Sequence, residues 1–315
     1  MSDTHEVLAS IHKPWKEFLK AWKQARSTAS EKSIHDLRVS TRRMIASLEV
    51  VRAASSSQSV ALLQKQFKKV LKRMGPLRDL QVQLEKLTRL RVNGVVTDFK
   101  RRLERREEDE TKEIRDKLKP QERRQLERSL QEVRSIFDKA DGNIDIRRRM
   151  EEIVRVRRSE FFKTRRRFKP GNDETLHEMR IALKKFRYVT EVAAPYLGKW
   201  AKESADTMHA YQQLMGDSRD VELLRNELEK WAAKRGKMIA VVPVLDRLSR
   251  RRTRLLKSIT KSSDMLEHIL PIERLRPTKK PTRNGIATPK TPTNLPPAIV
   301  NLGRSSESLS TGQNE

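Results

Sequence analysis

Two short stretches of the sequence place cations at the same spacing after a histidine. HDLRVSTRR covers residues 35–43 and HEMRIALKK covers residues 177–185. In each, an arginine follows the histidine by three residues, and two cations follow by seven and eight. On an α-helix these spacings place the charges on one face. Arginine and lysine held on a rigid helix offer hydrogen-bond donors to anionic oxygens, so each stretch is a candidate anion-binding surface.

Both stretches have the pattern of an amphipathic helix, with apolar residues opposite the cations. The first apolar set is Ile34, Leu37, Met44, Ile45, Leu48 and Val51, and the opposed set is His35, Arg38, Arg42 and Arg43. The second apolar set is Leu176, Met179, Leu183, Phe186 and Ala193, opposed by His177, Arg180, Lys184 and Lys185, with Arg187 at the edge. We expect the apolar sets to face the core.

The segment LLQKQFKKVLKRM, residues 62–74, repeats this design. Its apolar stripe is Leu63, Phe67, Val70, Leu71 and Met74, and its opposite stripe is Lys65, Lys68, Lys69 and Lys72. The matching segment later in the chain, KESADTMHAYQQLM, has His209 where the first has Lys68, and far fewer cations. The two halves of the chain are therefore expected to contribute unequally to any anion site.

Further blocks repeat in the same order at a nearly constant offset. MGPLRDLQVQLEKL from residue 74 matches MGDSRDVELLRNEL from residue 215, and RRLERR from residue 101 matches DRLSRR from residue 246. EFLKAWKQ from residue 17 matches EFFKTRRR from residue 160, which pairs Lys20 with Lys163 and Lys23 with Arg166. These blocks indicate an internal duplication, with repeat one at about 5–140 and repeat two at about 146–270. Each repeat is predicted to form about four helices.

Glycine and aspartate recur in the matched blocks. We predict that Gly75 and Gly216 end helices in a left-handed conformation, with Pro76 opening the next helix. Asp79 and Asp220 are interpreted as ion-pair partners or first-turn acids of that next helix, without a catalytic role.

Composition limits the class of protein. The net charge of +28 predicts attraction for polyanions such as nucleic acid, acidic membrane surfaces and polyphosphates. The chain has no cysteine, no signal-peptide pattern and no apolar stretch of about 18 residues, so we expect an intracellular, cytoplasmic protein without a membrane span. Residues 271–315 are rich in Pro, Ser and Thr and are predicted to form a disordered tail. Gly142 and Asn143 mark a predicted break between the repeats.

A structural interpretation of the stripes competes with the functional one. A row of cations on an amphipathic helix is usually its solvated face, and a histidine near a helix start can bond to the free backbone N–H groups there. Like charges at this spacing weaken an isolated helix by a few tenths of a kcal/mol per pair, however. A bound polyanion would offset that repulsion.

The repeated pattern H-x-x-R-x-x-x-R/K-R/K, followed by L/M-G-x-x-R/N-D, resembles the CHAD domain, the conserved histidine α-helical domain. The resemblance covers residues 5–270. It implies an all-α fold of two four-helix bundles with pseudo-twofold symmetry, and non-catalytic binding of inorganic polyphosphate in a basic groove or channel between them. Family members often accompany a triphosphate-hydrolysing domain marked by E-x-E-x-K, which we do not expect in this chain. Association with polyphosphate granules is a further expectation.

The resemblance assigns the site residue by residue. The motif helices contribute His35, Arg38, Arg42, Arg43, His177, Arg180, Lys184, Lys185 and Arg187. The extensions of the site are Lys65, Lys68, Lys69, Lys72, Lys20, Lys23, Lys163 and Arg166. Independently of the family, polyphosphate offers charge without bases or sugars, so an array of arginine and lysine on opposed helices suits it.

Three other classes of function are weighed against this one. A nucleic-acid-binding protein would also be basic, but aromatic residues make up only 5% of the chain, although Tyr188 falls on a cationic face. A metal site using His35 and His177 would lack further ligands and face repelling arginines. A phosphate-processing enzyme would need carboxylates to hold magnesium, and Asp36 and Glu178 point away from the stripes. The sequence therefore favours a binding protein that needs no cofactor, and it leaves the oligomeric state open.

Overall fold

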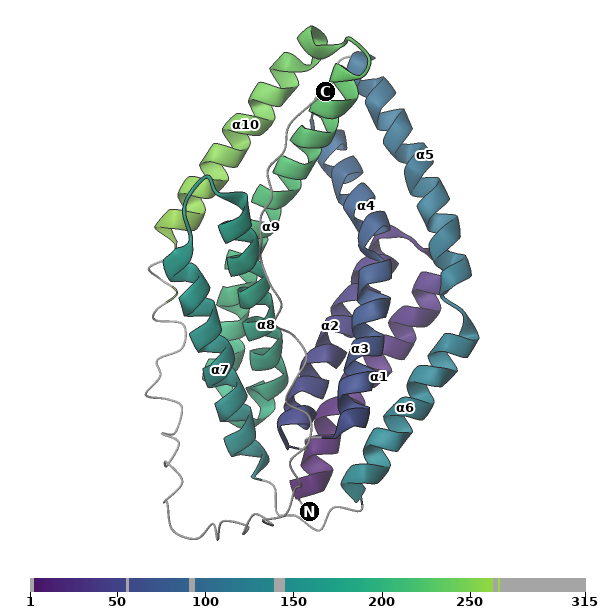
Figure 1. Ribbon diagram of the computed structural model, residues 1–315, viewed down its shortest axis with the longest axis vertical. Helices are drawn as coiled ribbons and strands as arrows, with labels where there is room; N and C mark the ends of the chain where they lie inside the picture. Colours follow the sequence, from purple (N-terminus) through teal and green to yellow (C-terminus); the bar gives the residue numbers. More distant parts are fainter. Residues whose placement is uncertain (1–2, 55–56, 91–93, 139–144, 263–265, 267–315) are drawn as a thin grey trace, which may run out of the picture. The chain divides into compact units, whose positions relative to one another are not determined.

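The computed structural model describes residues 3–54, 57–90, 94–138, 145–262 and 266, and every regular element in these ranges is a helix. The all-α prediction is confirmed. In chain order (Figure 1) the helices are α1 (Asp3–Thr28), α2 (Glu31–Ala54), α3 (Gln58–Arg73), α4 (Gly75–Thr88), α5 (Gly94–Lys117), α6 (Pro120–Asp138), α7 (Ile146–Arg167), α8 (Asp173–Leu197), α9 (Lys199–Ala233) and α10 (Met238–Lys261). The predicted tail and the predicted break at Gly142 and Asn143 lie outside the described residues.

The two predicted repeats differ in how many helices their described residues form. The second has four, α7 to α10, as expected, whereas the first has six. Each additional break has a proline at the start of the following helix, although Pro14, Pro195 and Pro243 lie inside α1, α8 and α10. Pro76 lacks a backbone N–H and would clash within a continuous helix, so α3 and α4 are separate, whereas the aligned Asp217 lies inside the single helix α9. Pro120 likewise begins α6 after the end of α5.

The prediction for the two matched glycines is wrong. Among the described residues, the glycines with positive φ are Gly171, Gly198 and Gly236. Gly75 begins α4 and Gly216 lies in the middle of α9, both without a left-handed conformation. A β-carbon at residue 216 would sit 3.8 Å from Nη2 of Arg180, an ordinary van der Waals contact, so the guanidinium of Arg180 lies beside this part of α9.

The hydrophobic core joins helices from both halves of the chain. One buried cluster includes Phe18 from α1, Phe67 from α3 and Phe186 from α8. The other includes Phe99 from α5 and Trp231 from α9. Buried side chains of the two halves of the chain therefore meet in a continuous core in each cluster. Because apolar burial is the main stabilising term in folding, this shared core holds the two motif helices in one rigid unit.

The predicted core faces of the motif helices are confirmed. Ile34, Leu37, Met44, Leu48 and Val51 of α2 are fully buried, and Ile45 is partly buried against the same core. On α8 the buried set is Leu176, Met179, Leu183, Phe186 and Ala193. Burial of these faces leaves the cations of α2 and α8 at the boundary between the core and the solvent.

Candidate functional site

The two motif helices bring cations from both halves of the chain to one place. α2 carries Arg38 and Arg42, α8 carries Arg180 and Lys184, and the two helices pack against each other. Burial lowers the pKa of Arg180 and of Lys184, and the charge of Arg42 on the opposite helix lowers both further. These four residues interact across the repeats, and we call them the central cation cluster.

Burial, and then the charge of neighbouring cations, disfavours the charged forms of Arg38, Arg180 and Lys184. Burial, followed by the charge of Arg42, lowers the pKa of Arg38 to about 10. The pKa of the Lys184 ammonium is held well below its usual value by burial and then by Arg180, Arg42 and Arg38. A lowered pKa of a base means that its cationic form is destabilised. An anion bound between these groups would relieve that cost.

Most hydrogen-bond donors of the cluster have no partner within the part of the chain that the structure describes. Arg42, Arg180 and Lys184 have no carboxylate within 4.0 Å there and no side-chain hydrogen bond, and Nε of Arg180 is buried without an acceptor. Arg38 donates one hydrogen bond, from Nη1 to the carbonyl oxygen of Leu71 at 3.3 Å. Buried polar groups are normally paired. The unpaired donors indicate a place for an anionic ligand.

Two aspartates lie among these cations. Partial burial raises the pKa of Asp79, on α4, and of Asp220, on α9, while neighbouring cations oppose the rise. Oδ2 of Asp220 lies 4.0 Å from Nζ of Lys86, so the predicted ion-pair role is confirmed for this residue. For Asp79 the prediction is wrong within the described residues, because it has no ion pair there and follows the first turn of α4. Because the four cations of the cluster outnumber these two carboxylates, the net charge at the cluster stays positive.

Two arginines outside the predicted site also contribute to its charge. The charge of Arg78 adds to burial in lowering the pKa of His35, and that of Arg219 acts in the same way on His177. Both arginines belong to the repeated R-D element of the sequence. Because this element occurs twice in the sequence, its repetition could have identified Arg78 and Arg219 as candidate site residues.

Both motif histidines are exposed side chains whose pKa values are lowered. Burial of ring atoms is the largest cause, and the adjacent arginines add to it. At neutral pH their rings are therefore neutral and can donate or accept one hydrogen bond each. Neither ring has a hydrogen-bond partner among the described residues, and the N-terminus of α8 is capped by Asn172, which accepts from the N–H groups of Glu174 and Thr175. The capping alternative is not observed.

Arg43 and Arg187 are placed differently from the central cation cluster. Arg43 pairs with Glu17 at 2.8 Å and with Glu191 at 3.6 Å. The Arg187 side chain is only 8% exposed and pairs with Glu191 at 2.7 Å, and its Nε donates to Gln212. Protein groups therefore engage donors of both arginines, from other helices and, for Glu191 with Arg187, from the next turn of the same helix. Their arrangement suits a structural role.

Replacing Arg187 with alanine is expected to lower the free energy of unfolding by about 1–3 kcal/mol, because Glu191 and Gln212 would lose a partly buried charged partner. Denaturant unfolding followed by circular dichroism measures this change. The same variant should weaken polyanion binding less than Arg42→Ala does. Unchanged stability together with a large loss of binding would place Arg187 in the binding surface instead.

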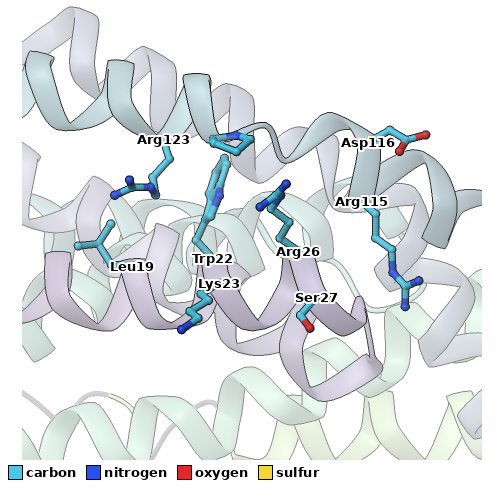
Figure 2. Close-up of a pocket in the computed structure, with 9 residues that line it drawn as sticks. Leu19, Trp22, Lys23, Arg26, Ser27, Arg115, Asp116 and Arg123 are labelled. Atoms are coloured by element: carbon cyan, nitrogen blue, oxygen red, sulfur yellow. The ribbon is translucent and has the colours of Figure 1, made fainter.

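The remaining predicted cations lie on exposed helix faces. Lys65, Lys68, Lys69 and Lys72 form an exposed row on α3, and the Arg38–Leu71 hydrogen bond places one end of this row beside the cluster. Lys185 of α8 is exposed as well. Of the flanking set, Lys20, Lys163 and Arg166 are exposed on α1 and α7. Lys23 instead lines a separate cavity between α1, α5 and α6 (Figure 2).

Carboxylates and histidines of the described ranges form no cluster suited to a metal ion. There, no three side chains of His, Cys, Asp or Glu gather closely enough to hold a metal ion. Contrary to expectation, the pattern E-x-E-x-K occurs once, at residues 108–112. It lies on helix α5, where residues two apart point to nearly opposite sides, so Glu108 and Glu110 cannot act on one ligand. Among the described helices, none combines the length and apolar character required to cross a membrane.

The fold and the site define an all-α protein with a cation cluster built from two histidine-motif helices. A family model for the CHAD domain matches residues 9–229, and the chain belongs to the CHAD-domain family. This family is linked to polyphosphate binding in general, and its domains are typically non-catalytic. No curated protein matches the sequence.

Two solved structures share the fold. The crystal structure of the CHAD domain from the plant Ricinus communis superposes with a TM-score of 0.66 at 17% sequence identity, covering 88% of this chain and 93% of that one. PptA from Streptomyces chartreusis superposes with a TM-score of 0.58 at 13% identity, covering 85% of this chain and 99% of that one. At these identities the likeness concerns the fold alone.

Proposed function

We propose that this protein binds inorganic polyphosphate, without chemical conversion, at the central cation cluster. The observation that carries the proposal is the convergence of Arg38 and Arg42 with Arg180 and Lys184, whose donors are largely unpaired in the described structure. A linear chain of phosphates can accept hydrogen bonds from opposed helices at once. Because the cations are held on rigid helices, little side-chain ordering opposes binding.

The site extends from the cluster along α3. Lys65, Lys68, Lys69 and Lys72 continue the positive surface next to Arg38, while the corresponding part of α9 carries His209 and few cations. Lys20, Lys163, Arg166 and Lys185 flank it. The extension is therefore one-sided, and we expect longer chains to gain affinity mainly through α3.

Binding without catalysis is supported by the surroundings of the two acids. Asp79 is surrounded by the charges of Arg38, Arg180, Lys184 and Arg219. These cations repel a metal ion, and burial, which raises the pKa of this carboxyl, disfavours its ionised form. A phosphate-processing site needs the opposite arrangement, in which several ionised carboxylates hold magnesium.

Nucleic acid is the competing partner, and the surroundings of Tyr188 argue against it. Its ring is 5% exposed and is covered by the guanidinium of Arg187 at 4.3 Å from the ring centroid. It offers no free face on which a base can stack. Base stacking on aromatic side chains is a main source of affinity for single strands, so a protein without it depends on charge alone.

The parent protein is therefore expected to prefer polyphosphate over nucleic acid of equal total charge by at least about tenfold in Kd at physiological salt. Competition binding, with labelled long-chain polyphosphate against duplex DNA and single-stranded RNA, measures this preference. Competition on even terms would overturn the assignment of polyphosphate and favour a general nucleic-acid-binding function.

A further inference from the structure

A cation-lined cavity of about 790 Å³ lies between α1, α5 and α6, apart from the central cation cluster. Lys23 and Arg26 reach it from α1, Arg115 from α5 and Arg123 from α6, and Asp116 is the one acid among the described residues that line it. In Figure 2, Arg26 extends from α1 toward α6, and Asp116 lies at the opposite end of the view from Arg123. The lining is therefore strongly positive. It shares no helix with the central cation cluster, which belongs to α2 and α8.

Among the described residues, the contacts of these four cations leave some of their hydrogen-bond donors without an acceptor. Nη2 of Arg115 donates to the carbonyl oxygen of Thr28 at 2.7 Å, which closes the C-terminus of α1. Arg123 pairs with Glu127 at 3.3 Å on its own helix. Within the described ranges, Lys23 and Arg26 have neither a hydrogen bond nor a carboxylate within 4.0 Å. Structural roles therefore account for Arg115 in part, and they do not account for Lys23 or Arg26.

The walls of the cavity are fixed and its floor is apolar. Trp22, which is 2% exposed, and the partly buried Leu19 form the base on α1. At the opposite wall, Arg73 of α3 holds the junction of α5 and α6 through Glu122, at 2.6 Å and 3.0 Å, and through the carbonyl oxygen of Lys117 at 3.1 Å. Charges beside an apolar floor interact more strongly with a ligand than charges fully in water.

We propose that this cavity binds a compact anion that carries several closely spaced phosphate groups. Four cations from three helices line one open cavity of limited size, which matches a small ligand with several phosphates better than the middle of a long chain. Two kinds of ligand offer such phosphate groups. One is a small cyclic or linear polyphosphorylated molecule, and the other is the end of a polyphosphate chain. The site is distinct from the central cation cluster and stands independently of the proposed function.

The test uses the full chain and isothermal titration with myo-inositol hexakisphosphate as a compact probe and tripolyphosphate as a probe for a chain end. The variant Lys23→Ala/Arg26→Ala removes the two cations that have no partner among the described residues. The control is Lys13→Ala/Lys16→Ala, because these exposed lysines lie on the same helix at the same spacing. A third variant, Arg42→Ala/Lys184→Ala, removes charges from the central cation cluster.

We expect Lys23→Ala/Arg26→Ala to weaken binding of the favoured compact probe by at least about tenfold, and the control to change it by less than about threefold. The probe that binds more tightly identifies the source of the phosphates. Equal losses in the two α1 variants, or loss of compact-probe binding in Arg42→Ala/Lys184→Ala alone, would overturn the proposal. If Arg42→Ala/Lys184→Ala did not weaken the binding of long-chain polyphosphate, this result would contradict the proposed function. The proposal for the cavity would still stand.

Discussion

Replacing Arg38, Arg42, Arg180 and Lys184 together with alanine is expected to reduce the affinity for long-chain polyphosphate by more than about a hundredfold. A hydrogen bond to a charged group is worth about 1.5–3 kcal/mol, and about 2.7 kcal/mol corresponds to a hundredfold change in Kd, so the loss of two such bonds would suffice. The unpaired donors of the cluster make this loss local. Fluorescence anisotropy with end-labelled polyphosphate at physiological salt measures it.

The control removes four cations that lie elsewhere. Lys112, Arg124, Arg128 and Lys234 are exposed and have no ion pair among the described residues. Their replacement with alanine lowers the net charge by the same amount as the cluster variant. If binding depended only on total charge and counterion release, both variants would lose affinity equally. Equal losses would therefore contradict a localised site.

Loss of binding in the cluster variant must be separated from loss of structure. The lowered pKa values of Arg38, Arg180 and Lys184 show that their charged forms are disfavoured in the folded protein. Removing these charges relieves repulsion, which offsets the loss of the hydrogen bond from Arg38 to Leu71, of side-chain packing and of the cations that neighbour Asp79 and Asp220. We therefore expect helicity and melting temperature to stay close to those of the parent, as circular dichroism would show.

The helical faces could be predicted from the sequence because the periodicity of a helix is a local property. The spacing of Leu37, Met44 and Leu48 identified the buried side of α2, and the same spacing placed Arg38 and Arg42 at its edge. The repeat of the motif then indicated that α8 would carry a matching set. These inferences needed only the three or four residues that separate neighbours on a helix.

The exceptions depended on contacts between distant residues. Arg43 has the same local pattern as the other cations, but it pairs with Glu17 of α1 and Glu191 of α8, and these pairings follow from how the helices pack. The pairing of Arg187 with Glu191, by contrast, joins neighbouring turns of α8. The shared core of the two halves is also a tertiary property. The environment of Gly216 could not be predicted from the adjacent residues of the sequence, because it includes the guanidinium of Arg180 from another helix. A single sequence does not specify such partners.

Polyphosphate binding is expected to take up protons, so its affinity should fall as the pH rises. Lys184 faces Arg180 on its own helix, Arg38 and Arg42 on α2, and Asp220 on α9. Burial and the three arginines lower its pKa, and Asp220 opposes them only in part. A bound polyanion favours the ammonium form and raises this pKa again. Protonation of Lys184 and binding therefore promote each other.

Asp79 and Asp220 also make polyphosphate binding tighter as the pH falls, in a lower pH range than Lys184 does. Burial raises the pKa values of Asp79 and Asp220, and a nearby polyanion would raise them further. As the pH falls through these values, protonation removes two negative charges that oppose the ligand. The lowered pKa values of His35 and His177 would also rise on binding. All these groups favour tighter binding at lower pH.

Each proton taken up on binding changes the affinity by about tenfold per pH unit in the range where the group titrates. Titration calorimetry in buffers with different ionisation enthalpies measures the number of protons, and Kd measured against pH gives the slope. The variant Lys184→Arg keeps the positive charge but replaces the ammonium with a guanidinium, which holds its proton more strongly. It should therefore bind polyphosphate with a smaller alkaline slope than the parent. Two outcomes would contradict this role of Lys184. One is an affinity that rises with pH, and the other is an equal slope of affinity against pH in the alkaline range for the parent and Lys184→Arg. Either would show that the bound anion does not contact the charged ammonium of Lys184.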